Sequence, residues 1–188
     1  MKEKEPKTSD IKFGTDGWRG LIARDFTFAN VRRAAQAVAD FVKSAPQLPG
    51  QGGKMIPLRA DTKIVVGYDN RFQSDQFAES VAQVLQASGI KATLMAEPLP
   101  TPAVSWLTAK TDNKLGVVIT ASHNPPSWNG FKIKWGGRAA PEAVTLGVEA
   151  LMETSVADAG GEVTRKSFKD GYLGYLKGLF DTSAITRR

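Results

Sequence analysis

The chain has 188 residues, of which 41% are hydrophobic, so it is long enough to bury a substantial core in one domain or slightly more. It has no cysteine and one histidine, which excludes disulfide frameworks, thiolate zinc sites, cysteine nucleophiles and multi-histidine metal sites. The net charge is +6, but the basic residues are scattered in blocks no longer than a pair, so a small anionic ligand suits them at least as well as nucleic acid.

The N-terminal residues 1–11 are predicted to form a flexible, solvated tail, because Lys and Glu alternate there around a proline. This tail lacks the apolar stretch of a signal peptide, and no other run approaches the roughly 20 apolar residues of a membrane span. We therefore expect a cytoplasmic protein without a membrane partner. The following residues, up to Gly20, have the composition of a loop.

Helices and strands are predicted to alternate along the rest of the chain. The first helix follows Thr27 as its N-cap, and a second one is expected to begin with Ser74 as its cap and to end at Gly89. Residues 46–60 contain three prolines and three glycines and are predicted to be an irregular loop. Strands are predicted over residues 62–69, 90–95, 115–120 and 131–135, and further helices through Trp106 and from Pro141.

This order of elements predicts an α/β fold, a three-layer α/β/α domain with a mixed, mainly parallel sheet. A further helical pattern follows in residues 168–188, after the domain is complete. Its apolar face has nothing left in the sequence to cover it, so the chain either continues in a longer protein or packs back on itself. We expect the first.

The segment TASHNPPSWNGFK, residues 120–132, is the main candidate for a functional site. Ser122 follows a strand that is predicted to be buried, and ligands in open α/β sheets bind beyond the carboxyl ends of the strands. Asn129-Gly130 is expected to turn the chain and bring Lys132 near Ser122, from the face of its strand opposite the apolar residues. Cations and the N–H groups of a tight turn suit a serine that carries a phosphoryl group, although a plain polar turn is the alternative.

Two other motifs could contact a ligand. GTDGWRG, residues 14–20, has glycines three apart and Arg19, which could bind a phosphate. VGYDNR contains Arg71, for which a salt bridge at the start of the next helix is expected rather than a ligand contact. The neighbouring Ser122 and His123 leave a hydrolase as an alternative, although the G-x-S-x-G elbow is missing.

The segments FGTDGWRG, VVGYDNR, LPTPAVSW and VITASHNPPSWNGFKIK occur in the order and spacing of the first domain of the α-D-phosphohexomutases. The chain resembles this superfamily from Lys12 to Lys177. The resemblance implies that Ser122 carries the phosphoryl group and also binds Mg²⁺ through its phosphate. It further implies a reaction centre lined by His123, Lys132 and Arg19, with phosphate or substrate bound by Arg19, Lys132 and Asn124.

In the family mechanism, the serine passes its phosphoryl group to a hexose 1- or 6-phosphate and recovers it from the other position, with hexose 1,6-bisphosphate as intermediate and activator. Three Asp residues of a second domain complete the Mg²⁺ site. The resemblance therefore divides the chain into domain I, residues 12–165, and the start of the segment to a second domain, residues 166–188. It implies a phosphosugar and the downstream domains as partners, no nucleic acid, and an inactive isolated fragment.

Trp18 favours the phosphoglucomutase/phosphomannomutase branch, because phosphoglucosamine mutases usually have an aliphatic residue at this position. The choice among glucose, mannose and glucosamine lies outside this sequence. The alternative to an enzyme domain is a stand-alone basic α/β module that uses the same loop to bind anions.

Overall fold

The computed structural model describes residues 11–44, 46–49, 55–58, 61–110, 115–152, 156–157 and 162–180. The strands are β1 (Trp18–Leu21), β2 (Gln47–Pro49), β3 (Met55–Pro57), β4 (Ile64–Tyr68), β5 (Ala92–Met95), β6 (Leu115–Ile119), β7 (Trp128–Trp135), β8 (Arg138–Ala139) and β9 (Arg165–Lys166). The helices are α1 (Phe28–Lys43), α2 (Ser74–Ala87), α3 (Thr101–Lys110), α4 (Glu142–Glu149) and α5 (Lys169–Lys177).

The central sheet has seven strands in the order β1-β7-β6-β4-β5-β9, and β8 also pairs with β7. Strands β4, β5, β6 and β9 pair in parallel, whereas β7 is antiparallel to β1, β6 and β8. Among the described strands of this sheet, only β7 therefore runs in the reverse direction. The short loop between β6 and β7 dictates this, because parallel neighbours need a crossover such as α2 or α3. The predicted mixed, mainly parallel sheet is confirmed.

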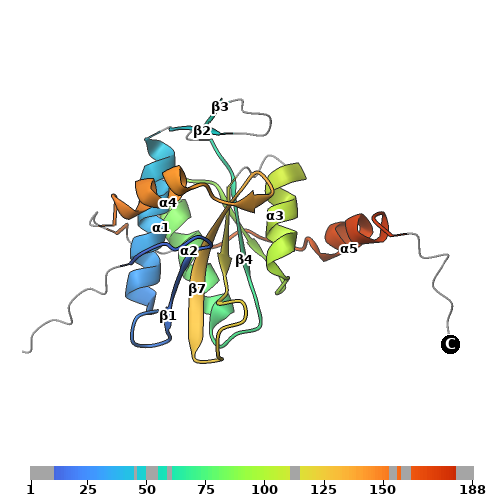
Figure 1. Ribbon diagram of the computed structural model, residues 1–188, viewed down its shortest axis with the longest axis horizontal. Helices are drawn as coiled ribbons and strands as arrows, with labels where there is room; N and C mark the ends of the chain where they lie inside the picture. The colour runs from blue at the N-terminus through green and yellow to red at the C-terminus, as the bar shows by residue number, and fades with distance from the viewer. Residues whose placement is uncertain are drawn as a thin grey trace, which may run out of the picture.

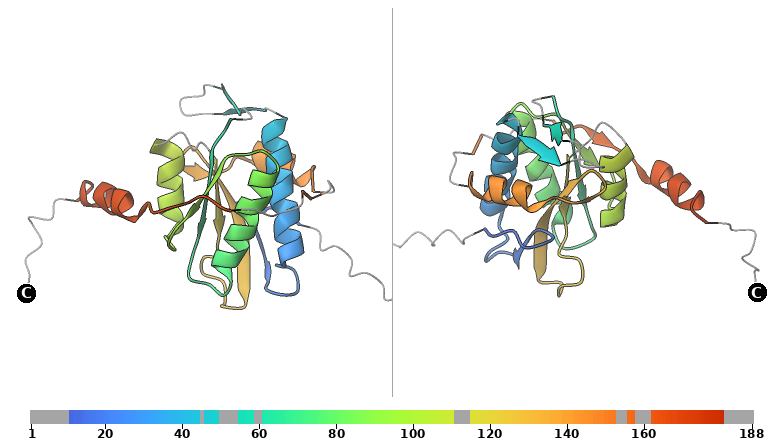
Figure 2. Two further views of the ribbon diagram at one scale, coloured as in Figure 1. Left: turned by 180° about the vertical axis from the view of Figure 1, so that it is seen from behind. Right: turned by 45° about the horizontal axis from the view of Figure 1, so that its top comes forward.

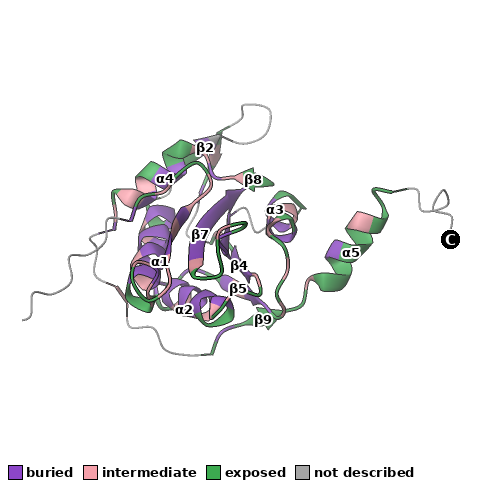
Figure 3. Ribbon diagram, turned by 60° about the horizontal axis from the view of Figure 1, so that its bottom comes forward, coloured by how far each residue is buried: buried purple, intermediate pink, exposed green. Residues whose placement is uncertain are grey.

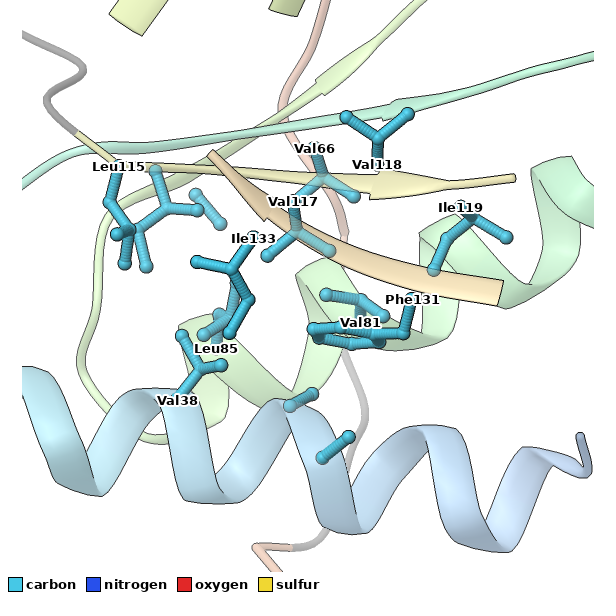
Figure 4. Packing of buried hydrophobic residues seen from close by; sticks show 14 of the residues in the cluster. Val38, Val66, Val81, Leu85, Leu115, Val117, Val118, Ile119, Phe131 and Ile133 are labelled. Atoms are coloured by element: carbon cyan, nitrogen blue, oxygen red, sulfur yellow. The ribbon is translucent and has the colours of Figure 1, made fainter. Parts of the chain in front are cut away.

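Helices α1 and α2 pack over one face of the sheet and α3 over the other (Figures 1 and 2). Figure 4 shows Val38 of α1 and Leu85 of α2 pointing toward Val117 and Ile133 of the sheet, and all four side chains are buried. Strands β4 and β6 are buried along their whole length, as expected for strands covered on both faces. The three-layer α/β/α prediction is thus confirmed.

Close packing of α3 depends on two glycines in the central strands. A Cβ atom at Gly67 or Gly116 would lie 2.5 or 2.6 Å from a methyl carbon of Val104 in α3. Because real Cβ atoms do not approach other atoms so closely, a larger residue would push α3 away from the sheet.

The predicted helix boundaries are confirmed in part. Thr27 caps α1, and Gly89, with a φ of 79°, follows the end of α2 as predicted. The prediction for Ser74 is wrong: the N-cap of α2 is Gln73, and the Ser74 hydroxyl donates to Asp69 Oδ1 over 2.9 Å. The helix predicted from Pro141 is confirmed as α4, but Pro141 is its N-cap, so the helix begins one residue later and ends at Glu149.

Residues 46–60 are not wholly irregular, in contrast to the prediction. Strands β2 and β3 pair there as a small antiparallel sheet, in which Gln47 lies opposite Pro57 and Pro49 opposite Met55. The prolines are tolerated because they stand at strand ends, where a missing N–H breaks few ladder bonds. The intervening residues 50–54 lie outside the described residues.

The C-terminal helix α5 extends away from the body of the domain (Figure 1). Tyr172 is buried against Trp106 of α3, with 5.8 Å between the ring centroids, so the helix is attached through its aromatic face. Leu173 and Leu179 remain 40% and 57% exposed, and most of α5 is green in Figure 3. The predicted apolar face is therefore covered only in part.

Residues 1–10 of the predicted tail lie outside the described residues, and Ile11 is buried. The division into residues 12–165 and 166–188 stays a prediction. Within the described ranges, no helix is long and apolar enough to cross a membrane.

Candidate active site

The loop that carries Ser122 connects β6 to β7 at the carboxyl edge of the sheet, where the loops after β1 and β4 also lie (Figure 1). Ser122 is exposed, and its φ of 58° lies in the left-handed region, which costs a residue with a side chain about 1–2 kcal/mol. Such a conformation persists only where the surroundings impose it. The predicted position beyond the end of a buried strand is confirmed.

Asp69, directly after β4, supports the base of this loop. Its Oδ2 accepts a hydrogen bond from Thr120 Oγ1 over 2.5 Å, and the same hydroxyl oxygen accepts the backbone N–H of Ser122 over 2.9 Å. Asp69 Oδ1 accepts from the Ser74 hydroxyl and from the backbone N–H of Arg71, over 2.9 and 3.0 Å. The N–H of Ser122 is therefore committed within the protein, although a tight-turn N–H was expected to face a phosphate.

Arg71 reaches across to the same loop. Its Nε lies 3.4 Å from Asp69 Oδ2, so the predicted salt bridge near the start of α2 is confirmed. The prediction missed the larger part of its role. The two Nη atoms donate to loop carbonyl oxygens over 2.7 to 3.0 Å, namely those of Ser122, Asn124, Pro125 and Trp128.

Asn129 and Gly130 do not form the predicted turn. Both lie in β7, and the chain reverses earlier, with the positive φ at Ser122. A Cβ atom at Gly130 would lie 2.6 Å from the carbonyl oxygen of Thr120 and 2.9 Å from that of Trp18. The glycine is therefore needed for close approach of the neighbouring backbones, and the Asn129 amide donates to Ser74 Oγ over 2.9 Å.

Lys132 lies on the face of β7 opposite Phe131 and Ile133, as predicted, but it is buried rather than solvated. Its Nζ contacts Asp16 Oδ2 over 2.5 Å, and Lys134 Nζ contacts Asp16 Oδ1 over 2.7 Å. Two buried ammonium groups thus share one carboxylate, so the cluster carries one excess positive charge. This excess favours an anion on the same face of the sheet.

Burial by itself would raise the pKa of Asp16, but the hydrogen bonds and charges of Lys132 and Lys134 outweigh it and lower the pKa below its usual value. A carboxyl with a lowered folded-state pKa stabilises the fold above its unfolded pKa of about 3.9 and loses this contribution as the pH falls toward the folded value. We expect Asp16→Asn to melt at a lower temperature than the wild type at pH 7. The difference between the two melting temperatures should shrink below about pH 4, and a constant difference down to about pH 2.5 would contradict this assignment.

Arg19 lies on β1 opposite Gly130, on the same face as Lys132. Its Nε is buried without a hydrogen-bond partner, and Arg19 makes no ion pair with any described residue. Buried polar groups are seldom left unpaired, so this guanidinium has donors available for an anion. The Oδ1 atom of Asn124, in the Ser122 loop, is also buried without a partner.

Ser122 and Asn124 line a cavity of about 460 Å³, together with Asp69, Asn70, Arg71, Phe72 and Pro126. Arg19 and Lys132 do not line it and lie on the adjacent strands β1 and β7. His123 is exposed and accepts or donates no hydrogen bond within the described part of the chain, so no described carboxylate orients its ring as a hydrolase base. A larger cavity of about 660 Å³ lies at the amino edge of β4 and β5, near Lys63 and Lys91.

The described residues contain no cluster of three or more His, Asp or Glu side chains that could hold a metal. Mg²⁺ requires near-octahedral oxygen ligands, and the nearest carboxylate to Ser122 in the network, Asp69, already accepts from Thr120, Ser74 and Arg71. The described residues therefore do not make up a complete Mg²⁺ site.

The family model for phosphoglucomutase/phosphomannomutase, alpha/beta/alpha domain I, matches residues 10–158. The chain is 33% identical over 178 residues to a phosphoglucosamine mutase of Thermotoga petrophila, covering 93% of this chain and 37% of that protein. It is 37% identical over 106 residues to a Haemophilus influenzae protein assigned as a phosphomannomutase, covering 56% and 19% of the two chains.

A crystal structure of a Thermus thermophilus protein, assigned as a phosphomannomutase, superimposes with a TM-score of 0.80 at 32% identity, over 94% of this chain and 37% of that one. The matched part of this chain thus spans 37% of the length of the Thermotoga petrophila relative and 19% of that of the Haemophilus influenzae one. The match to the family model covers most of the chain and includes the Ser122 loop, Arg19 and Lys132. By sequence and by fold, the chain belongs to the α-D-phosphohexomutase superfamily, in which it corresponds to the α/β/α domain I of the phosphoglucomutase/phosphomannomutase family.

Proposed function

We propose that this chain is the phosphoserine-bearing domain of an intramolecular phosphotransferase that interconverts hexose 1-phosphate and hexose 6-phosphate. The observation that carries the proposal is the exposed Ser122, held in a left-handed conformation at the carboxyl edge of the sheet. Unpaired donors of Arg19 and the excess positive charge around Lys132 lie on neighbouring strands. These are the features that a phosphoryl group and its negative oxygens require.

In the proposed transfer, the bond between Ser122 Oγ and phosphorus breaks while a hexose hydroxyl oxygen bonds to phosphorus. The sugar hydroxyl gives up its proton and the serine oxygen regains one, so the product is hexose 1,6-bisphosphate and free serine. The return transfer uses the phosphoryl group at the other sugar position. Lys132 would supply charge or a proton, and Arg19 and Asn124 would bind phosphate oxygens.

The remaining parts of this proposal lie beyond the chain. Mg²⁺ would bind the phosphate on Ser122 with ligands from downstream domains of the same protein, so we expect the 188-residue chain alone to be inactive. Glucose or mannose is our proposed hexose, although several relatives are phosphoglucosamine mutases. Trp18 gives no physical support for glucose or mannose over glucosamine, because it is buried and stacked on Phe26 at 4.8 Å between ring centroids.

We also propose a phosphosugar rather than nucleic acid as the ligand, and a cytoplasmic location. Lys and Arg are scattered along the chain in blocks no longer than a pair, which suits a small anion better than an extended polyanion. A stand-alone anion-binding module is the second candidate, because the unpaired Arg19 would serve simple binding equally well.

Intact-mass analysis decides between these two functions. The full-length protein, purified after incubation with glucose 1,6-bisphosphate, should carry one phosphate that peptide mapping places on Ser122. The variant Ser122→Ala should carry none, while Ser127→Ala, which changes another exposed serine of the same loop, should be phosphorylated normally. An unmodified wild-type protein that still binds inorganic phosphate would favour the binding module.

A further inference from the structure

We infer that Arg71 is a positioning residue, which holds the backbone of residues 122–128 in the conformation that presents the Ser122 hydroxyl. This inference rests on the phosphotransfer function proposed above. Arg71 does not belong to the Ser122 loop or to its neighbours in sequence: it lies 51 residues before Ser122 and is fixed at the carboxyl end of β4.

The donors of Arg71 are fully used within the protein. A guanidinium has five N–H bonds in a rigid planar fork. Four of them face the loop carbonyl oxygens, and the fifth, at Nε, faces Asp69 across the 3.4 Å ion pair. The side chain is 14% exposed. No donor is left for a phosphate, so Arg71 acts on the reaction through the loop rather than through the substrate.

The loop needs such a partner because it has few bonds of its own. Pro125 and Pro126 lack N–H groups, and the loop's internal backbone bonds run from Asn124 to Ala121 and from Trp128 to Pro125, over 3.1 and 3.0 Å. The carbonyl of Ser122, the residue with the left-handed φ, accepts one of the two shortest Arg71 bonds, at 2.7 Å. Arg71 therefore constrains the residue whose conformation is the least favourable.

Lysine cannot replace this arrangement, although it keeps the charge. Its ammonium group is a single point with three donors, whereas four carbonyls converge on the two separate Nη atoms of Arg71. Arg71→Lys thus removes the geometry and retains the positive charge. Arg165→Lys is the matched control, because Arg165 also makes a side-chain ion pair, with Glu79 at 3.1 Å, but lies on β9.

The first arm of the test uses the ¹⁵N,¹³C-labelled 188-residue chain and needs no activity. In Arg71→Lys we expect the backbone resonances of residues 122–128 to move. The three-bond coupling between the amide and α protons of Ser122, which reports φ, should no longer correspond to a left-handed φ. Signals of α1 should stay in place, and Arg165→Lys should leave the loop unchanged. In Arg71→Ala, added guanidinium ion should restore the loop signals. Wild-type loop signals in Arg71→Lys would overturn the inference.

The second arm measures single-turnover transfer from phosphorylated Ser122 to glucose 1-phosphate in the full-length protein. Arg71→Lys should slow it about 10²-fold while the half-saturating concentration of the sugar phosphate stays nearly constant, since a misplaced phosphoryl donor costs rate rather than binding. An unchanged rate would overturn the inference. A wild-type protein that transfers no phosphate, with the expected result in the first arm, would reject the proposed function and leave the positioning of Ser122 by Arg71 intact.

Discussion

Replacement of Ser122 by alanine is expected to reduce phosphosugar mutase activity of the full-length protein by at least about 10⁴-fold, because the variant lacks the oxygen that carries the phosphoryl group. The domain should still fold. Ser122 is exposed, its backbone N–H bond to Thr120 does not involve its side chain, and alanine tolerates the left-handed φ no worse than serine does. Steady-state turnover and thermal melting of the same preparation would measure the two effects.

Ser127→Ala is the control for this experiment, since Ser127 is exposed in the same loop and contributes its carbonyl oxygen rather than its hydroxyl, accepting the Ile22 N–H over 2.9 Å. Its activity should stay near that of the wild type. Substantial turnover by Ser122→Ala, in protein free of contaminating mutase, would show that Ser122 does not carry the phosphoryl group.

The second large effect is expected for Lys132→Ala. Loss of a charged group that assists proton or phosphoryl transfer typically costs about 10²- to 10⁴-fold in rate. The structure also predicts that this variant is less stable than the wild type, which the sequence does not suggest. Lys132 is 3% exposed and paired with Asp16, so its removal should destabilise the domain by about 1–2 kcal/mol through lost packing and a lost charged hydrogen bond.

Lys134→Ala separates these two contributions. Lys134 is equally buried, lies on the same face of β7 and contacts the same carboxylate. It pairs with Gly116 near the start of β6, however, whereas Lys132 pairs with Val118, two residues closer to the Ser122 loop. We expect similar melting temperatures for the two variants and a much smaller activity loss for Lys134→Ala. Equal activity losses would show that Lys132 is a structural lysine.

Much of the fold could be predicted because its signals are local. The N-cap Thr27, the terminal Gly89 and the apolar runs of β4 and β6 each depend on a few neighbouring residues. The short strands β1, β8 and β9 were not predicted, since two to four residues carry no usable periodicity and become strands only by pairing with distant segments.

The misread Asn129-Gly130 pair shows how tertiary context overrides a local preference. This dipeptide favours a tight turn, but the space between the Thr120 and Trp18 carbonyls admits only a glycine in an extended strand. The burial of Lys132 also could not be predicted from its neighbours in sequence. Gly17, more than a hundred residues earlier, passes so close that a Cβ atom there would lie 2.9 Å from Lys132 Cγ.

Within the candidate site, the position of Ser122 followed from a general rule about the carboxyl ends of parallel strands. The same rule could have found Asp69 and Thr120, which follow the neighbouring strands β4 and β6. The carbonyl contacts of Arg71 could not have been found in this way. Backbone oxygens are present at every residue, so their convergence on one side chain leaves no trace in the amino-acid sequence.

The hydrogen bonds from Arg71 to carbonyl oxygens have a consequence for redesign of the Ser122 loop. These contacts do not depend on the side chains of the loop. Exposed positions such as Pro126 and Ser127 could therefore be exchanged for residues of other sizes and charges without displacing Ser122. A library of substitutions at these two positions should therefore leave the phosphoryl carrier where it is. The composition of the loop surface and the placement of Ser122 are separable, because the first depends on loop side chains and the second on a single distant arginine.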